Sequence, residues 1–174
     1  GLVVGASLGH DIGKYGVLYE EINRVPYLHY YYAEEWFKGY GMDGIGHIAT
    51  NHSTWDLELD TLPIESLILI YSDFRVKNKV ENDIYTMHIF SLEESFDVIL
   101  NKLDNVDEAK ENRYKKVYSK LKDFEDYIVS LGVDTTLLEK SIKSIKKPYE
   151  LMNKKEVIEN IKYISIEHNI HLMN

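Results

Sequence analysis

The chain has 174 residues, of which 44% are hydrophobic, a formal net charge of −9 and no cysteine. This length supports one domain, or one domain with an appended subdomain, around a buried core. Without cysteine the chain has no disulfides, thiolate nucleophiles or cysteine-type structural zinc, and a cytoplasmic location fits best. The acidic balance argues against a long nucleic acid as partner, because neutralising phosphates requires a basic surface. No apolar run reaches the roughly 18 residues that a membrane span needs.

The first part of the chain alternates helix-forming segments with polar connections. Pro26 suits the first turn of a helix, Gly39 and Gly41 suit its end, and Pro63 precedes the most apolar helical run. Asp43 is expected to cap a short helix that carries two histidines. The other predicted helices cover residues 2–14, 26–38 and 64–76, with a loop at 15–25 and polar links at 51–62 and 77–83; His47 and His52 are the two histidines of the short helix.

The second part of the chain is also predicted to be helical. Ser91 and Glu94 form a capping-box pattern at the start of one helix. Further helices are expected at 105–131, 135–146 and 154–168, and a short extended piece at 84–90. No Asn-Gly or Asp-Gly hairpin joins two alternating runs. The predicted fold class is all-α, with a helical bundle over residues 1–80 and a C-terminal helical extension over residues 81–174.

Two adjacent metal-ligating side chains lie near the start of the chain. His10 and Asp11 offer an imidazole and a carboxylate on neighbouring residues, and Lys14 follows one helical turn later. A His-Asp dipeptide alone is weak evidence, because it often arises by chance. Further support lies downstream, at His29, at His52 and at an aspartate late in an apolar helix, Asp73.

These residues together resemble the HD superfamily of metal-dependent phosphohydrolases. The run Leu-Gly-His-Asp-Ile-Gly-Lys at 8–14 is similar to the motif that ends a helix in that family, and histidines and an aspartate follow on later helices. The resemblance covers about residues 1–80. It implies an all-α HD-type fold and the hydrolysis of a phosphomonoester, phosphodiester or nucleotide phosphoanhydride by a metal-activated water.

The resemblance also implies a role for each site residue. His10, Asp11 and Asp73 are the expected metal ligands, and Asp11 and Lys14 the expected catalytic residues. His29, His52 and Lys14 are expected to bind a second metal or a substrate phosphate. Ligands of this kind suit a divalent manganese, iron, cobalt, nickel, zinc or magnesium ion. The expected partner is a small phosphorylated compound, in particular a nucleotide.

The chain departs from the family pattern in three respects. The family's first ligand histidine lies on an upstream helix, whereas only nine residues precede His10 here. We therefore expect the chain to be a fragment or an incomplete copy of a longer protein. Without the first ligand histidine, the chain itself is expected to bind metal weakly. The interval from His10 to His29 is shorter than in the compact bacterial members that cleave dinucleoside polyphosphates, which the spacing otherwise most resembles. Tyr30 also stands where a glycine usually follows the histidine.

An alternative function is a catalytically degenerate HD domain that acts as a regulatory, nucleotide-binding or RNA-binding module. The basic residues that would support RNA binding lie close together at Lys140, Lys143, Lys146 and Lys147. Trp55 could stack on a nucleobase, although tryptophan is more often part of a core. We expect His47 to be a bystander and do not assign Arg75 to the site, since helix geometry turns it away from Asp73.

Overall fold

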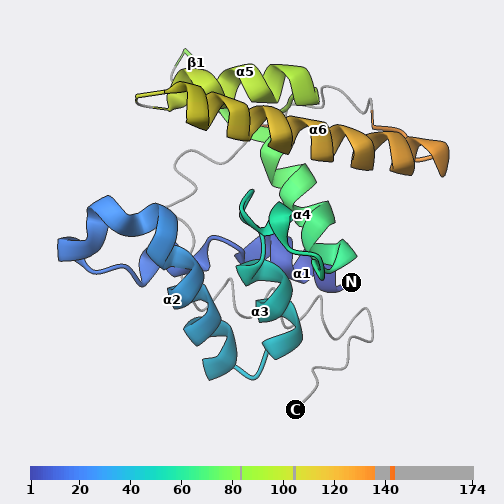
Figure 1. The fold of residues 1–174 in the computed structure, drawn as a ribbon. Helices are drawn as coiled ribbons and strands as arrows, with labels where there is room; N and C mark the ends of the chain where they lie inside the picture. The colour runs from blue at the N-terminus through green and yellow to red at the C-terminus, as the bar shows by residue number, and fades with distance from the viewer. Residues whose placement is uncertain (83, 104, 136–141, 144–174) are drawn as a thin grey trace. The chain divides into compact units, whose positions relative to one another are not determined.

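The computed structural model describes residues 1–82, 84–103, 105–135 and 142–143, and its fold is all-α (Figure 1). The chain forms two compact units that divide between Ile70 and Tyr71, within one helix. The sequence analysis placed the end of the predicted catalytic core ten residues later, at residue 80. The assignment of a catalytic core to residues 1–80 stays a prediction. Within the described ranges, no helix is long and apolar enough to cross a membrane.

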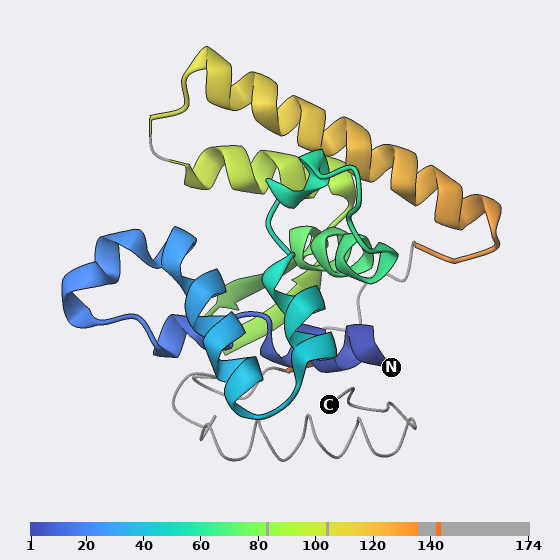
Figure 2. The ribbon, with the colours of Figure 1, turned by 60° about the horizontal axis from the view of Figure 1, so that its bottom comes forward.

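The first unit is built from α-helices connected by short 3₁₀ turns. The α-helices are α1 (Leu2–Gly9), α2 (Val25–Gly39), α3 (Asp43–Thr50) and the start of α4 (Ile64–Arg75). The 3₁₀ helices are η1 (Ile12–Tyr15), η2 (Tyr19–Arg24) and η3 (Asp56–Glu58). Helices α2 and α3 run antiparallel side by side, and the segment that carries η2 projects beyond the start of α2 (Figures 1 and 2).

The core of the first unit forms where α1, α2, α3 and the start of α4 meet. Phe37, Met42 and Ile45 are completely buried at the junction of α2 and α3. The remaining core residues are Ala6, Ile12, Ala33, Ile48, Ala49 and Leu69. Small residues permit this close packing: a Cβ on Gly46 would lie 2.7 Å from the Cβ of Phe37. The core therefore fixes α2 against α3. Helix α2 carries the candidate site residue His29, and His52 follows the end of α3.

Local signals predicted α2 and α4 correctly, but the extents predicted for α1 and α3 are wrong. Helix α1 ends at Gly9 rather than near Lys14, because the chain turns there and continues as a 3₁₀ helix against α2. The N-cap of α3 is Met42, not Asp43. Helix α3 ends at Thr50, where the Asn51 side chain donates to the carbonyl of His47 at 2.7 Å. His52 thus lies beyond the helix, in the polar connection that also contains η3.

The second unit contains a small antiparallel sheet of strand order β1-β2-β3. Strand β1 (Val76–Glu81) pairs with β2 (Ile84–Ile89), and β2 pairs with β3 (Ile142–Lys143). The predicted extended piece at 84–90 is confirmed, whereas the prediction of a polar link at 77–83 is wrong. Asn82 has a φ of 52° and follows β1 directly, which is the backbone conformation that a tight hairpin needs. The hairpin was missed because its sequence is Asn-Asp rather than Asn-Gly.

Two antiparallel helices, α5 (Leu92–Lys102) and α6 (Glu108–Ser130), accompany the sheet (Figure 1). The capping box is confirmed: Ser91 Oγ accepts from the Glu94 backbone at 3.1 Å, and Glu94 accepts from the Ser91 backbone at 2.8 Å. Helix α6 confirms the predicted long helix. The predicted helix 135–146 is wrong at residues 142–143, which form β3. Its remaining residues beyond 135, and the predicted helix 154–168, lie outside the described residues.

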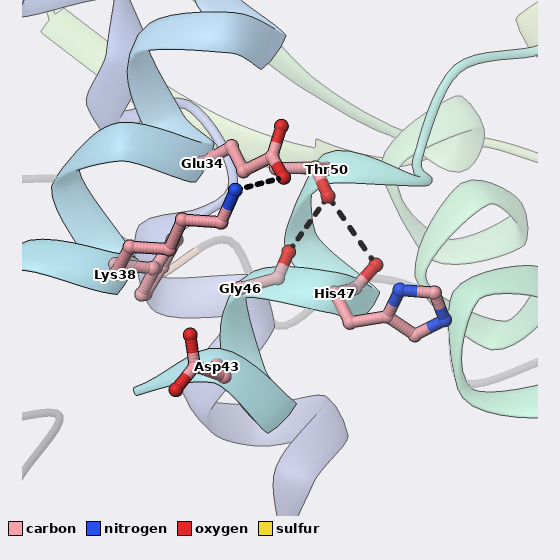
Figure 3. Close-up of a pocket in the computed structure, with 7 residues that line it drawn as sticks. Glu34, Lys38, Asp43, Gly46, His47 and Thr50 are labelled. Carbon is pink, nitrogen blue, oxygen red and sulfur yellow. Dashed lines mark hydrogen bonds and ion pairs between the residues drawn. The ribbon is translucent and has the colours of Figure 1, made fainter. Parts of the chain in front are cut away.

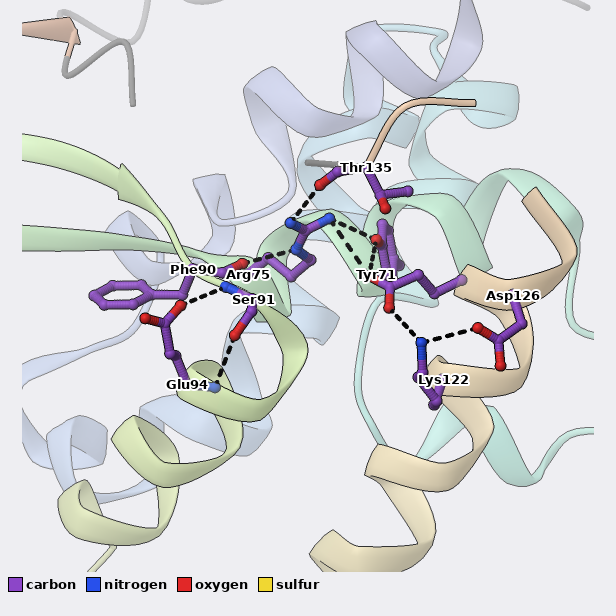
Figure 4. A network of polar contacts seen from close by, with 9 residues as sticks. Tyr71, Arg75, Phe90, Ser91, Glu94, Lys122, Asp126 and Thr135 are labelled. Atoms are coloured by element: carbon purple, nitrogen blue, oxygen red, sulfur yellow. Dashed lines mark hydrogen bonds and ion pairs between the residues drawn. The ribbon is translucent and has the colours of Figure 1, made fainter. Parts of the chain in front are cut away.

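Arg75 anchors the end of α4 inside the second unit (Figure 4). Its buried guanidinium donates to the carbonyl of Phe90 at 2.8 Å, to the hydroxyl of Tyr71 at 2.5 Å and to the carbonyl of Thr135 at 2.8 Å. Glu125 lies 3.8 Å from the same guanidinium and accepts from Tyr71. Burial raises the pKa of Tyr71 to about 12, so this phenol stays protonated. Arg75 is therefore a structural residue that joins α4 to the start of α5 and to α6.

Candidate metal site

The candidate site is centred on the Asp11 carboxylate, in the turn between α1 and η1. Ile12 is buried in the core and holds this turn in place. Gly13 then allows α2 to approach very closely: a Cβ there would lie 1.8 Å from the carbonyl oxygen of His29 and 2.5 Å from the backbone nitrogen of Ala33. Because no side chain fits in that space, only glycine at position 13 allows His29 to lie beside Asp11.

Three imidazole rings surround this carboxylate. The Nε2 atoms of His29 and His52 lie 3.7 and 3.9 Å from Asp11 Oδ1. On the other side of the carboxylate, His10 Nε2 lies 3.8 Å from Asp11 Oδ2. Both His29 and His52 are buried, at 5% and 7% exposure. The Asp11 side chain remains 42% exposed, so solvent can reach the centre of the site.

The other nitrogen of each ring is held by a backbone carbonyl. His10 Nδ1 lies 2.9 Å from the carbonyl oxygen of Ser7, and His29 Nδ1 lies 2.7 Å from that of Val25. His52 Nδ1 makes a short hydrogen bond to the carbonyl oxygen of Ala49. A carbonyl oxygen only accepts, so each Nδ1 carries a proton. In the neutral ring, Nε2 then carries the lone pair, and this is the nitrogen nearer to the Asp11 carboxylate. Metal-ligating histidines are commonly arranged in this way.

The distances across the cluster fit ligands of a shared cation better than direct hydrogen bonds. Separations of 3.7–3.9 Å exceed the range of a hydrogen bond. Two ligands bound to one ion at about 2.0–2.2 Å are separated by roughly 3.0–4.4 Å. Ligand atoms of His10, Asp11 and His52 all lie within 4.8 Å of one another. A small inward movement of these side chains would bring three protein ligands onto one ion.

Lys14 neutralises one oxygen of the central carboxylate. Its ammonium lies 2.5 Å from Asp11 Oδ2, and both side chains are partly exposed. Asp11 therefore presents two different sides: Oδ1 faces His29 and His52, and Oδ2 faces His10 and Lys14. A cation and an anionic group could be held next to each other here, the first by the imidazoles and the second by the lysine.

The electrostatic environment favours the neutral form of the most buried histidine of this group. Burial lowers the pKa of His29 below its ordinary value, an effect that the Val25 carbonyl and the Asp11 charge partly oppose. A neutral imidazole is the form that binds a metal ion. His29 is therefore ready to act as a ligand near neutral pH.

Asp73 belongs to the second unit and is not one of the residues gathered around Asp11 within the first unit. Its side chain is exposed on α4, and its backbone carbonyl accepts from Lys77 at 2.6 Å. Its ligand role stays a prediction. Trp55 is 57% exposed rather than part of the core.

His47 lines the edge of a hollow of about 220 Å³ between α2 and α3, and its exposed ring points away from Glu34 and Lys38 (Figure 3). Glu34 and Lys38 form an ion pair of 2.7 Å along one wall of this hollow. The ordinary surface position of His47 makes it a useful control residue.

Tyr30 is the residue at this site whose contacts the sequence analysis missed. Its ring lies against the ring of His29, with centroids 3.9 Å apart, and against that of His52 at 4.8 Å. In the sequence, Tyr30 stood out only as a departure from the family pattern, and its position directly after His29 was the available signal.

No protein-family model, curated protein or solved structure matches this chain.

Proposed function

We propose that the protein is a metal-dependent phosphohydrolase of the HD type, acting on a small phosphorylated substrate such as a nucleotide. The observation that supports this function best is the convergence of His10, His29 and His52 on Asp11. Each ring points its Nε2 atom toward the carboxylate while a backbone carbonyl holds its Nδ1 atom. Structural packing alone does not require three imidazoles to share this orientation.

The side chains divide the work of the proposed site. His10, Asp11 and His52 are the proposed ligands of one divalent cation, and His29, beside His52 on the Oδ1 side, is the proposed ligand of a second cation or of a substrate phosphate. The backbone hydrogen bonds at Nδ1 orient the rings and increase their basicity. When bound, such a cation acidifies water and stabilises negative charge on a phosphoryl oxygen. Lys14 is placed to bind a phosphate oxygen as a point charge, because its ammonium is partly exposed beside the same carboxylate.

The test is a hydrolysis assay with a panel of nucleotides and generic phosphodiesters. Each substrate is combined with manganese, iron, cobalt, nickel, zinc or magnesium. We expect metal-dependent activity in the unchanged protein and background activity in Asp11→Asn, because the amide removes the negative charge that both sides of the site share. His47→Ala is the matched control, since it removes an exposed histidine from the same unit and should retain activity.

A second pair of variants tests the role of the lysine. Lys14→Ala should mainly raise KM, whereas Lys38→Ala, which removes an exposed lysine paired with Glu34, should leave KM unchanged. Full activity in Asp11→Asn would contradict the proposed site. Metal binding without hydrolysis of any substrate would favour the regulatory-module alternative.

A further inference from the structure

Tyr30 makes a set of contacts that the proposed chemistry does not yet use. Its ring is tilted by 39° against His29 and by 50° against His52. The two imidazoles are 5.5 Å apart between centroids, so one phenol ring lies against both. The side chain is half-buried on α2. Neighbouring residues on a helix point about 100° apart, so ring contact between His29 and Tyr30 is not a consequence of their adjacency alone.

The two histidines need such a contact if they are to act as ligands. Each is held through Nδ1 by one backbone hydrogen bond, to Val25 or to Ala49. A single hydrogen bond fixes one atom of a ring but lets the ring tilt about it. A second contact, from a neighbouring ring, restricts that tilt and helps to keep Nε2 directed at Asp11 Oδ1. The Tyr30 ring makes such a contact with both histidines, and the ring of His10 makes another with His52 at 4.8 Å.

We propose that Tyr30 is a positioning residue that orients the imidazoles of His29 and His52 toward Asp11 Oδ1. By doing so, Tyr30 sets the affinity with which these residues bind a cation. The inference rests on the proposed metal-dependent function. Tyr30 acts through the two histidines, so its aromatic face matters more than its hydroxyl. Outer-sphere residues that orient metal ligands typically change metal affinity by about 10–100-fold when replaced.

The first experiment measures imidazole tautomers in metal-free protein by long-range ¹H–¹⁵N NMR. In the unchanged protein and in Tyr30→Phe, both rings should be in the Nδ1–H form. In Tyr30→Leu, at least one ring should exchange between its two tautomers. Tyr31→Leu is the matched control, because Tyr31 is the next residue on α2 and its ring packs against Tyr32 instead. Tyr30→Met provides an unbranched replacement if the leucine variant does not fold.

The second experiment is a titration with cobalt(II), followed by visible absorption. We expect binding to be about 10–100-fold weaker in Tyr30→Leu and nearly unchanged in Tyr30→Phe and Tyr31→Leu. Equal cobalt affinity and unchanged tautomers in Tyr30→Leu would overturn the positioning role but leave the proposed function intact. If the unchanged protein binds no cobalt, the proposed function fails and the effect of Tyr30 on cation affinity fails with it. The tautomer measurement would then still show whether Tyr30 orients the rings.

Discussion

Gly13→Ala is the substitution for which the structure predicts the clearest effect. An added Cβ would lie 1.8 Å from the His29 carbonyl oxygen, 2.5 Å from the Ala33 backbone nitrogen and 2.8 Å from the His29 carbonyl carbon. All three are backbone atoms of α2, so no side-chain rotation can relieve the overlap. Ordinary contact begins at 3.4 Å, which means that the turn and α2 must separate by up to about 1.6 Å (3.4 − 1.8).

The expected cost follows from overpacking a rigid interface. Inserting a methyl group into a well-packed core typically costs about 1–3 kcal/mol. We expect Gly13→Ala to reach the upper end, about 3 kcal/mol, because helix backbone yields less than a side chain. The separation would also move His29 away from Asp11 Oδ1, from which its Nε2 is now 3.7 Å distant. The variant should therefore lose both stability and cobalt affinity.

Urea unfolding and cobalt titration measure the two effects, and Gly44→Ala is the control. A Cβ on Gly44 would meet only Leu2 Cδ2, at 3.8 Å, which is ordinary contact. Because Gly44 lies within α3, replacing it with alanine should stabilise the protein by about 0.5–1 kcal/mol. A Gly13→Ala variant as stable as the unchanged protein would refute the close approach of α2 to the Asp11 turn.

Four further substitutions test other parts of the structure. Arg75→Ala should lower the free energy of unfolding by about 3–5 kcal/mol in a urea titration, because it leaves buried partners of the guanidinium unpaired. Ser91→Ala should cost about 0.5–2 kcal/mol, as the loss of an N-cap does. The hydrogen bond from the Ser91 backbone N–H lowers the pKa of Glu94. The stability that this hydrogen bond contributes is therefore present above the ordinary carboxyl pKa of 4.5 and is lost as the pH falls through the lowered pKa. Glu94→Gln should flatten that part of the curve of unfolding free energy against pH. Burial raises the pKa of Asp56, because it disfavours the charged carboxylate. Asp56→Asn removes that charge and keeps an acceptor for the backbone N–H of Ser53, so it should raise the melting temperature at neutral pH. The gain should shrink as the pH falls through the raised pKa, where Asp56 itself becomes neutral.

Local signals predicted the fold well where one residue determines an element's end. Pro26 and Pro63 marked the starts of α2 and α4, and the Ser91 capping box marked that of α5. The β1–β2 hairpin was missed because Asn82 adopts a positive φ without a neighbouring glycine to signal a turn. The early end of α1 was missed for another reason. It depends on tertiary contact between Gly13 and α2, which hydrophobic periodicity does not report.

The candidate site was predictable in its residue types but not in its arrangement. The motif pointed to His10, Asp11, His29 and His52, and the structure gathers them within the first unit. Which nitrogen of each ring faces the carboxylate depends on backbone carbonyls three or four residues earlier. That relation requires the local backbone geometry, which the sequence alone does not supply. The contact of Tyr30 with two imidazoles likewise depends on side-chain directions across two segments.

Anomalous diffraction from cobalt-soaked crystals tests the central proposal most directly. The proposed site predicts a cobalt peak at roughly 2.0–2.2 Å from an Asp11 carboxylate oxygen and from the Nε2 atom of at least one of His10, His29 and His52. The peak should disappear in crystals of Asp11→Asn and persist in those of His47→Ala. A peak confined to other surface histidines, or one that survives in Asp11→Asn at full occupancy, would contradict the proposal that these residues form a metal site.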